Sequence, residues 1–345
     1  MSEHRSFLLL AKSFLATAYF KIFLVFLSVA VPLTVLYFLY PLSFDKTFNG
    51  RAYYLFFIWL VVLEFTLDWD KYKLDTTKMD VKRVVAFGVA LSLPTVYVIA
   101  SNFFGLNAAI SELAKLSGIL SPSLPDYADR LNFTPLAAEF LVFAVLFTTI
   151  ILCAYRAKGL KDFLIPIALL GVVGSTSMIN LLSPSFLPFQ ILVPPTAQLS
   201  ANVLGFMGYT TYLMPAGEYM PALFVRDPVS GASWQARIVW PCAGVESLML
   251  YTIIMLLFLK KSDIPRIHKV AYFAVGAAVT YFINILRIAT LFILGVNGGD
   301  VWTFHDYYGQ LYSAVWIMFY PLIIIGSQVI WSKYKDTIVN FIVND

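Results

Sequence analysis

The residue with the clearest chemical potential is Cys242, which follows Pro241 in the stretch RIVWPCAGVESLMLY at residues 237–251. The stretch changes there from polar and aromatic-rich to purely apolar, so we expect the cysteine at the start of a membrane helix. A thiolate is the reactive form of cysteine, and a helix N-terminus or a nearby cation lowers the pKa of the thiol. Taken alone, a cysteine in an apolar sequence is a small buried filler. The position of this one indicates a nucleophile.

Two later segments add a cation and an acid–base group. Arg287 lies in NILRI at residues 284–288, and His305 lies in the loop GVNGGDVWTFHDYYG at residues 295–309. Arginine carries a permanent positive charge, and histidine exchanges a proton near neutral pH. A thiol with such partners is typical of nucleophilic catalysis. Asn284, one turn before Arg287 on the same helix face, indicates a polar site rather than an arginine that anchors a helix at the interface.

The backbone after the cysteine can also take part in chemistry. The N–H groups of Ala243, Gly244 and Val245 are free in the first turn of a helix, so they can surround the sulfur and hold an oxyanion. We expect Gly244 to let a peptide backbone approach closely. Glu246 opposes this arrangement, because a carboxylate one turn after the cysteine raises the pKa of the thiol unless it is paired. Arg237 is the candidate partner.

The elements that must position these residues are membrane helices. The chain has 345 residues, of which 60% are hydrophobic and only 13% are charged, about half the charged fraction of a soluble domain. Apolar stretches of about 17–25 residues are long enough to cross the hydrocarbon core as helices. The sequence predicts eight such helices, near residues 22–42, 52–67, 84–101, 136–155, 163–182, 243–259, 270–294 and 310–331.

The lysines and arginines between these helices predict their orientation, because cytoplasmic loops are enriched in both residues. Of the 24 in the chain, 17 lie on the side that holds both termini, six lie on the other side, and Arg287 belongs to neither. Both termini are therefore expected in the cytoplasm, and the loop 183–241 is expected to face outward.

The same topology predicts depth in the membrane. From Cys242 inward to Lys260, and from Lys269 outward to Arg287, the chain advances 18 residues, which is about 27 Å of helix. That length is close to the thickness of the hydrocarbon core. Cys242 and Arg287 are therefore expected at one level near the outer interface, with His305 in the next outward loop.

The outward loop before the sixth helix predicts two small elements. VPPTAQLSANVLGFMGYTTYL at residues 193–213 is expected to be a helix capped by Thr196 after two prolines. The helix would carry an apolar stripe, formed by Leu199, Val203, Leu204 and Met207. Such a stripe indicates contact with the membrane interface. PALFVRDPVSGASWQARIVW at residues 221–240 predicts a hairpin with Gly231 in its turn, which leads directly into the cysteine.

Other chemically notable residues receive structural interpretations. Glu64 and Glu139 lie inside the second and fourth helices but toward their ends, so solvated interface positions are favoured over functional buried acids. Cys153 is expected to be a small apolar filler at the cytoplasmic end of the fourth helix. The sequence has no zinc-binding helix, no metal-ligand spacing and no phosphate-binding loop, so we expect neither a metal nor a cofactor.

Three motifs follow one another in a fixed order: WPCAGVES around Cys242, NILRI around Arg287 and HDYYG from His305. With TAQLSANVLGFMG ahead of the hairpin, this order resembles the exosortase/archaeosortase family of membrane transpeptidases over roughly residues 190–320. Within the family, the resemblance favours the archaeal branch, with the thaumarchaeosortases as the candidate group. The resemblance implies that Cys242 is the nucleophile, that Arg287 stabilises the oxyanion or the thiolate, and that His305 is the general acid/base.

The expected fold is an all-α polytopic membrane protein with about eight transmembrane helices, and with a small extracytoplasmic helix and β-hairpin before the sixth. Residues 1–345 are expected to form a single integral membrane domain, with an extracytoplasmic loop region at 183–241 and a catalytic motif region at 242–309. Ala243, Gly244 and Asn284 are the expected supporting residues.

The resemblance implies substrates that are exported proteins with a C-terminal motif, a transmembrane helix and a basic tail. The thiolate would cleave near the motif and form a thioester, and a membrane lipid amine would then accept the protein; hydrolysis is the other outcome. The protein would act in the cell membrane with its active site on the extracytoplasmic side. We expect no nucleic acid among its partners.

Two other classes of function remain open. A transporter or channel would need polar residues along a path through the membrane midplane, and GVVGSTSMIN at residues 171–180 is the main stretch that fits. Most polar residues cluster instead at one membrane face, which disfavours this class. A structural subunit of a membrane complex would not depend on Cys242.

Overall fold

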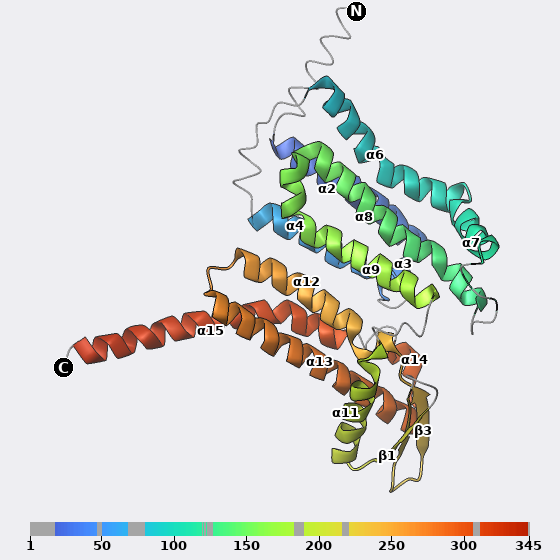
Figure 1. Ribbon diagram of the computed structural model, residues 1–345, viewed down its shortest axis with the longest axis vertical. Coiled ribbons are helices and arrows are strands. Elements are labelled where there is room, and N and C mark those ends of the chain that lie inside the picture. The colour runs from blue at the N-terminus through green and yellow to red at the C-terminus, as the bar shows by residue number, and fades with distance from the viewer. Residues whose placement is uncertain are drawn as a thin grey trace, which may run out of the picture. The chain divides into compact units, whose positions relative to one another are not determined.

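The computed structural model describes residues 18–46, 50–67, 80–118, 120, 122, 127–182, 190–215, 221–305 and 311–343. Its contacts divide the chain into two compact units, Met1–Ser183 and Pro184–Asp345 (Figure 1). The prediction of a single domain over the whole chain remains a prediction.

The first unit is a set of packed helices. They are α2 (Ala18–Leu39), α3 (Pro41–Phe44), α4 (Tyr53–Leu67), α6 (Val81–Phe103), α7 (Leu106–Leu116), α8 (Tyr127–Asp162) and α9 (Leu164–Leu182). The long helices are mostly apolar, and a helix satisfies its backbone N–H and C=O groups internally, as a segment in lipid requires. α8 is kinked at Arg156, whose φ of 60° and ψ of −165° are not helical. The helix end predicted at residue 155 coincides with this kink.

Aromatic side chains from α4 and α8 form part of the core of this unit. Tyr54 stacks on Phe140 with ring centroids 4.6 Å apart, and Phe57 meets Phe147 edge-on at 5.0 Å. All four rings are buried. Offset and edge-on ring pairs of this kind stabilise a core beyond the area that they bury.

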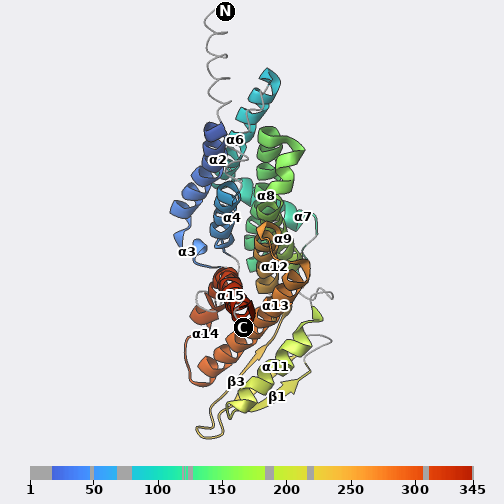
Figure 2. The same cartoon turned by 90° about the vertical axis from the view of Figure 1, so that its left-hand side faces the viewer.

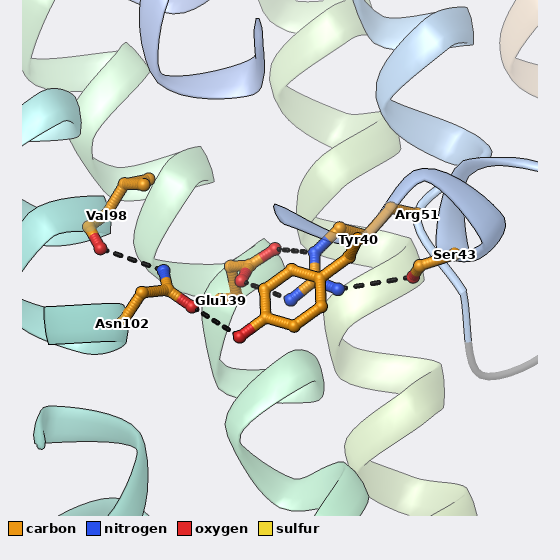
Figure 3. A network of polar contacts seen from close by, with 6 residues as sticks. All are labelled: Tyr40, Ser43, Arg51, Val98, Asn102 and Glu139. Carbon is orange, nitrogen blue, oxygen red and sulfur yellow. Dashed lines mark hydrogen bonds and ion pairs between the residues drawn. The ribbon is translucent and has the colours of Figure 1, made fainter. Parts of the chain in front are cut away.

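A buried ion pair joins the corner between α3 and α4 to α8 (Figure 3). Arg51 Nε and Nη2 donate to the two carboxylate oxygens of Glu139 at 2.8 and 2.9 Å, and the two side chains are 10% and 2% exposed. Glu64 is also fully buried. The prediction of solvated interface positions for both glutamates is therefore wrong. Sequence position along a helix does not reveal which face the neighbouring helices cover.

A small polar network surrounds this pair (Figure 3). Arg51 Nη1 donates to Ser43 Oγ at 3.2 Å, and the guanidinium lies 4.7 Å from the centroid of the Tyr40 ring. The Tyr40 hydroxyl donates to Asn102 Oδ1 at 2.8 Å, and Asn102 Nδ2 donates to Val98 O at 2.8 Å. The network therefore ties three segments that are distant in sequence, the α2–α3 corner, α6 and α8.

The second unit combines a small sheet with helices (Figure 2). Its elements are α11 (Val193–Phe206), β1 (Thr210–Met214), β2 (Ala222–Arg226), β3 (Ser233–Arg237), the 3₁₀ turn η1 (Trp240–Ala243), α12 (Val245–Lys261), α13 (Arg266–Val296), α14 (Val301–Thr303) and α15 (Leu311–Val343). The sheet has the order β1-β2-β3, and both pairings are antiparallel. α11 packs against β1 and α13.

The predicted hairpin is confirmed. β2 pairs with β3, so that Leu223 lies opposite Ala236. In the turn, Asp227 Oδ1 accepts a hydrogen bond from the Val229 N–H at 2.8 Å, and Gly231 takes a φ of +73°. An aspartate that bonds the backbone two residues ahead and a glycine with positive φ are the expected chemistry of such a turn.

The sheet is anchored to the C-terminal end of α13 through Trp234. Its ring meets Phe292 edge-on with centroids 4.9 Å apart. Its other neighbour is Gly295, where a Cβ would lie only 2.3 Å from Trp234 Cδ2. The glycine is therefore what lets β3 lie so close to the helix.

Residues 193–213 form a helix followed by a strand, so the prediction of one helix over this range is wrong. α11 ends at Phe206, Gly208 turns the chain with a φ of +95°, and Thr210 begins β1. β-Branched residues after a glycine favour a strand. The hairpin is thereby extended to three strands.

The predicted cap of α11 is wrong, and the contact of its apolar stripe with the membrane interface remains a prediction. The two prolines occupy the first turn, where their fixed φ and missing N–H are tolerated, so Thr196 lies inside the helix. Leu199 and Met207 are 40% and 57% exposed, whereas Leu204 is buried. The helix packs instead through a face rich in small residues: Val193, Thr196, Ala197, Ser200, Ala201 and Leu204.

An all-α polytopic membrane protein with a small sheet is confirmed. In the described part of the chain, five helices are long and apolar enough to cross a membrane: Phe20–Leu39, Val81–Phe103, Tyr127–Asp162, Leu164–Leu182 and Arg266–Val296. Shorter apolar helices lie at Tyr53–Thr66 and Val315–Trp331, and α12 has 17 residues. These helices coincide with the eight segments that the sequence predicts.

Replacing Arg51 by Met should destabilise the protein by about 3–5 kcal/mol, because it leaves the buried carboxylate of Glu139 without its partner. The double variant Arg51→Met/Glu139→Leu should recover most of this loss, since neither charge then remains buried. Unfolding of the purified protein in detergent, followed by heat or denaturant, measures both effects.

The exposed pair Lys115–Glu112, with 3.5 Å between its charged atoms, provides the matched control for the ion pair. Lys115→Met should change stability by less than about 1 kcal/mol. If Arg51→Met and the double variant lost the same amount of stability, this explanation of the ion pair would be contradicted.

Candidate active site

Cys242 lies in a short turn between the sheet and α12. β3 leads through an extended Val239 into η1, and the Cys242 N–H donates to Val239 O at 2.9 Å. Gly244 then turns the chain with a φ of +86°, and α12 begins at Val245. The sequence predicts the sulfur in the first turn of the helix, but the structure places it in the 3₁₀ turn just before the helix. The N–H of the cysteine is bonded to Val239 O and is not free for an oxyanion.

The thiol lies beside His305. Cys242 Sγ is 4.0 Å from His305 Nε2, and the cysteine is partly exposed. The histidine follows α14, whose first turn is capped by Asp300 Oδ1 accepting from the Thr303 N–H at 3.0 Å. The exposed Trp302 ring packs edge-on against the imidazole with centroids 6.2 Å apart. The rest of the HDYYG motif, at residues 306–309, lies outside the described residues.

Arg287 supplies a buried positive charge on α13. The residue is 3% exposed, and its Nε is fully buried. Within the described ranges, its guanidinium donates no hydrogen bond to another residue. Its charge is close enough to Cys242 to favour the thiolate. A buried cation with unused donors beside a thiol is suited to receive negative charge.

These groups act on the acidity of the thiol in opposite directions. Burial raises the pKa of Cys242, but the hydrogen bond to His305 and the charges of His305 and Arg287 lower it by more. Glu246 raises the pKa, as its position in the sequence indicates. The net result is a pKa below the ordinary value for a cysteine. Pairing of Glu246 with Arg237 remains a prediction.

Asn284 holds the turn in place. Its Nδ2 donates to Cys242 O at 2.9 Å, and the residue is fully buried. A Cβ on Gly244 would lie 3.0 Å from the same nitrogen. Glycine is therefore required at this position by its positive φ and by the contact with Asn284. The close approach of a peptide backbone to Gly244 remains a prediction. Ala243 is buried beneath the turn.

Two contacts at the site were missed by the sequence analysis. Thr196 Oγ1 lies 2.7 Å from the hydroxyl of Tyr281 and donates to Leu192 O at 2.6 Å. It also lies 3.5 Å from Ala243 O, which places α11 directly against the cysteine turn. The available signal was the spacing on α13, where Tyr281, Asn284 and Arg287 follow one another at intervals of three residues. No group of His, Cys, Asp or Glu that could hold a metal ion occurs among the described residues.

Replacing His305 by Ala should move the titration of Cys242 to higher pH, because the largest influence that lowers its pKa is then lost. The thiolate fraction falls as pH drops through the pKa, so a higher pKa shifts the whole reactivity profile upward. The rate of alkylation by iodoacetamide against pH, in purified protein with Cys153→Ala, measures this shift.

Glu246→Gln provides the opposite control, since removing a carboxylate that raises the pKa should move the profile to lower pH. Identical midpoints for His305→Ala and the parent protein, at an unchanged unfolding temperature, would show that the imidazole does not act on the thiol.

The sequence model of the family described as transmembrane exosortase matches residues 48–321, a range that contains Cys242, Arg287 and His305. No curated protein and no solved structure matches the chain. The assignment to the archaeal branch therefore remains a prediction. The family match covers most of the sequence, and the chain belongs to the transmembrane exosortase family.

Proposed function

We propose that the protein is a membrane cysteine transpeptidase that removes C-terminal sorting signals from exported proteins and transfers the proteins to a lipid anchor. Exosortases are membrane transpeptidases that process sorting signals, so membership of the family supports the general reaction. The observation that supports the proposal most is the 4.0 Å separation between Cys242 Sγ and His305 Nε2 beside the buried charge of Arg287.

The first half of the reaction forms a thioester. His305 Nε2 accepts the proton of the Cys242 thiol, and the thiolate attacks the carbonyl carbon of a peptide bond near the recognised motif. The carbonyl oxygen becomes an oxyanion, which the Arg287 guanidinium stabilises with donors that bond no other residue in the described part of the chain. When the C–N bond breaks, His305 returns its proton to the leaving amine. The exported protein is then joined to Cys242, and the peptide with the transmembrane helix leaves.

The second half of the reaction releases the protein. An amine of a membrane lipid attacks the thioester carbonyl while His305 takes up its proton, and collapse of the second oxyanion expels the Cys242 thiolate. The product is an amide between the exported protein and the lipid. Water in place of the amine gives the free carboxylic acid, which is the hydrolytic outcome.

The supporting residues keep the nucleophile in one position. The Asn284 amide fixes the carbonyl of Cys242, and Gly244 allows the sharp turn into α12. The N–H groups of Ala243 and Gly244 follow the sulfur directly and are the candidates for further donors to the oxyanion. A nucleophile that is fixed before substrate binds loses less entropy when it reacts.

The orientation of the protein in the membrane is part of this proposal. Both termini lie in the cytoplasm and the active site lies at the outer face of the cell membrane. The asymmetry of 17 against six lysines and arginines supports this orientation. Substrates are exported proteins, so an outward-facing site meets them after they have crossed the membrane.

The sequence feature that favoured a transporter has a packing explanation. Gly174, in the stretch 171–180, lies against α8, and a Cβ there would be 2.8 Å from Leu141 Cγ. Thr176 donates its hydroxyl to Val172 O of its own helix at 2.9 Å. Gly174 and Thr176 therefore serve contacts within the first unit, and they give a transport path no specific support.

Cys242→Ala and Cys242→Ser should abolish removal of the C-terminal tail, whereas Cys153→Ala should leave it intact. Arg287→Ala should lower the rate by about 10²- to 10³-fold, as loss of an oxyanion donor does, and Arg287→Lys should restore it only in part. The assay follows an exported reporter fused to the tail of a candidate substrate, co-expressed with each variant at equal abundance.

Normal processing by Cys242→Ala would overturn the proposed enzyme. An impermeant maleimide added to intact cells tests the outer-face location in the same assay. The reagent should stop processing by the Cys153→Ala protein. Continued processing after such treatment, with inhibition only in opened cells, would place the thiol on the wrong side.

A further inference from the structure

We propose that the outer edge of β3 binds the recognition segment of the substrate as an added, extended strand that is led toward Cys242. This inference rests on the proposed function and adds the mode of substrate binding to it. It follows from the register of the sheet, from the exposure of β3 and from the continuity between β3 and the cysteine turn.

The register shows which backbone groups of β3 face away from the sheet. The Ile238 N–H donates to Pro221 O at 3.1 Å, and the Asp227 N–H donates to Ala232 O at 2.9 Å. These bonds assign the even-numbered residues of the strand to the ladder with β2. In an antiparallel pair the intervening residues direct their N–H and C=O groups to the opposite side. Those residues are Ser233, Gln235 and Arg237.

This outer edge is open in the described part of the chain. No backbone hydrogen bond to a residue outside the sheet involves Ser233, Gln235 or Arg237. Their side chains are exposed, whereas Trp234 on the other face packs against α13. β3 is therefore fixed to α13 through Trp234, and its other edge presents a row of backbone donors and acceptors with no partner in the described part of the chain. Such an edge is a template for an extended peptide.

Continuity with the site favours a substrate over other occupants. β3 ends at Arg237, the chain remains extended at Val239 with φ of −112° and ψ of 162°, and Cys242 lies three residues further on. An added strand advances about 3.3 Å per residue, so four or five residues paired along this edge would bring the next peptide bonds to the sulfur. The edge is short and ends in a charge, two features that disfavour pairing with a second copy of the chain.

Gln235→Pro should lower processing of the reporter, because proline removes the outward N–H and places a ring at the pairing edge, while the ladder with β2 stays intact. We expect a decrease of at least about 3- to 10-fold at limiting reporter, which corresponds to one lost hydrogen bond. Gln235→Ala keeps the N–H and should process the reporter as the parent does.

Thr211→Pro is the matched control on the opposite edge of the sheet. Thr211 also faces away from β2, since its neighbours in β1 complete the ladder, and its loss of an N–H should leave processing unchanged. Unfolding temperatures of both proline variants show whether the sheet survives equally. Equal processing by Gln235→Pro and Thr211→Pro, in a protein whose activity depends on Cys242, would overturn the inference and leave the proposed function standing.

A second measurement does not depend on the proline variant folding. A photoreactive benzoylphenylalanine at Gln235, in the Cys242→Ala protein, should form an adduct with the co-expressed reporter, whereas the same group at the exposed Tyr212 of β1 should not. An adduct of two copies of this chain, or equal yields at the two positions, would contradict an edge reserved for substrate. Processing that persists in Cys242→Ala would instead refute the proposed function itself.

Discussion

The organisation of the second unit depends on one hydrogen bond, from the Asn284 amide to the carbonyl of Cys242. This bond fixes the cysteine turn to α13, the same helix that carries Arg287 one turn further along the chain. The C-terminal end of that helix also receives Trp234 and thereby the sheet. One helix therefore sets the position of Cys242, the proposed nucleophile, of the cation Arg287 and of the strand that leads to the cysteine. A change in its rotation or depth would move all three together.

The electrostatics of the site follow from this arrangement. Burial opposes a charged sulfur, so a reactive thiol needs nearby positive charge or a hydrogen bond that outweighs the loss of solvation. His305 and Arg287 supply both, and Glu246 acts against them. In the proposed reaction, the same cation would serve the thiolate at the start and the oxyanion later, because negative charge would pass from sulfur to oxygen over a short distance. A fixed charge of this kind needs no reorganisation as the reaction proceeds.

Sequence analysis predicted most of the fold because membrane helices carry a strong local signal. The apolar runs located the helices, and equal helix lengths predicted Cys242 and Arg287 at one level. The two residues lie close enough for the charge of Arg287 to act on the thiol, while their depth in the membrane remains a prediction. Local sequence patterns do not predict the contacts that tertiary packing determines. Glu139 was expected in solvent because sequence does not show that Arg51, 88 residues away, meets it inside the helix packing. The contact of Thr196 with Tyr281 was missed because it depends on α13, which comes much later in the chain.

The central claim is that the Cys242 sulfur becomes covalently attached to the exported protein. The most direct measurement follows purified enzyme and reporter in detergent with hydroxylamine, a small nucleophile that attacks thioesters. The account predicts a reporter that ends in a hydroxamate, formed faster as hydroxylamine is raised and absent with Cys242→Ala. Tail removal that yields only a carboxylate, at a rate independent of hydroxylamine, would contradict a thioester intermediate.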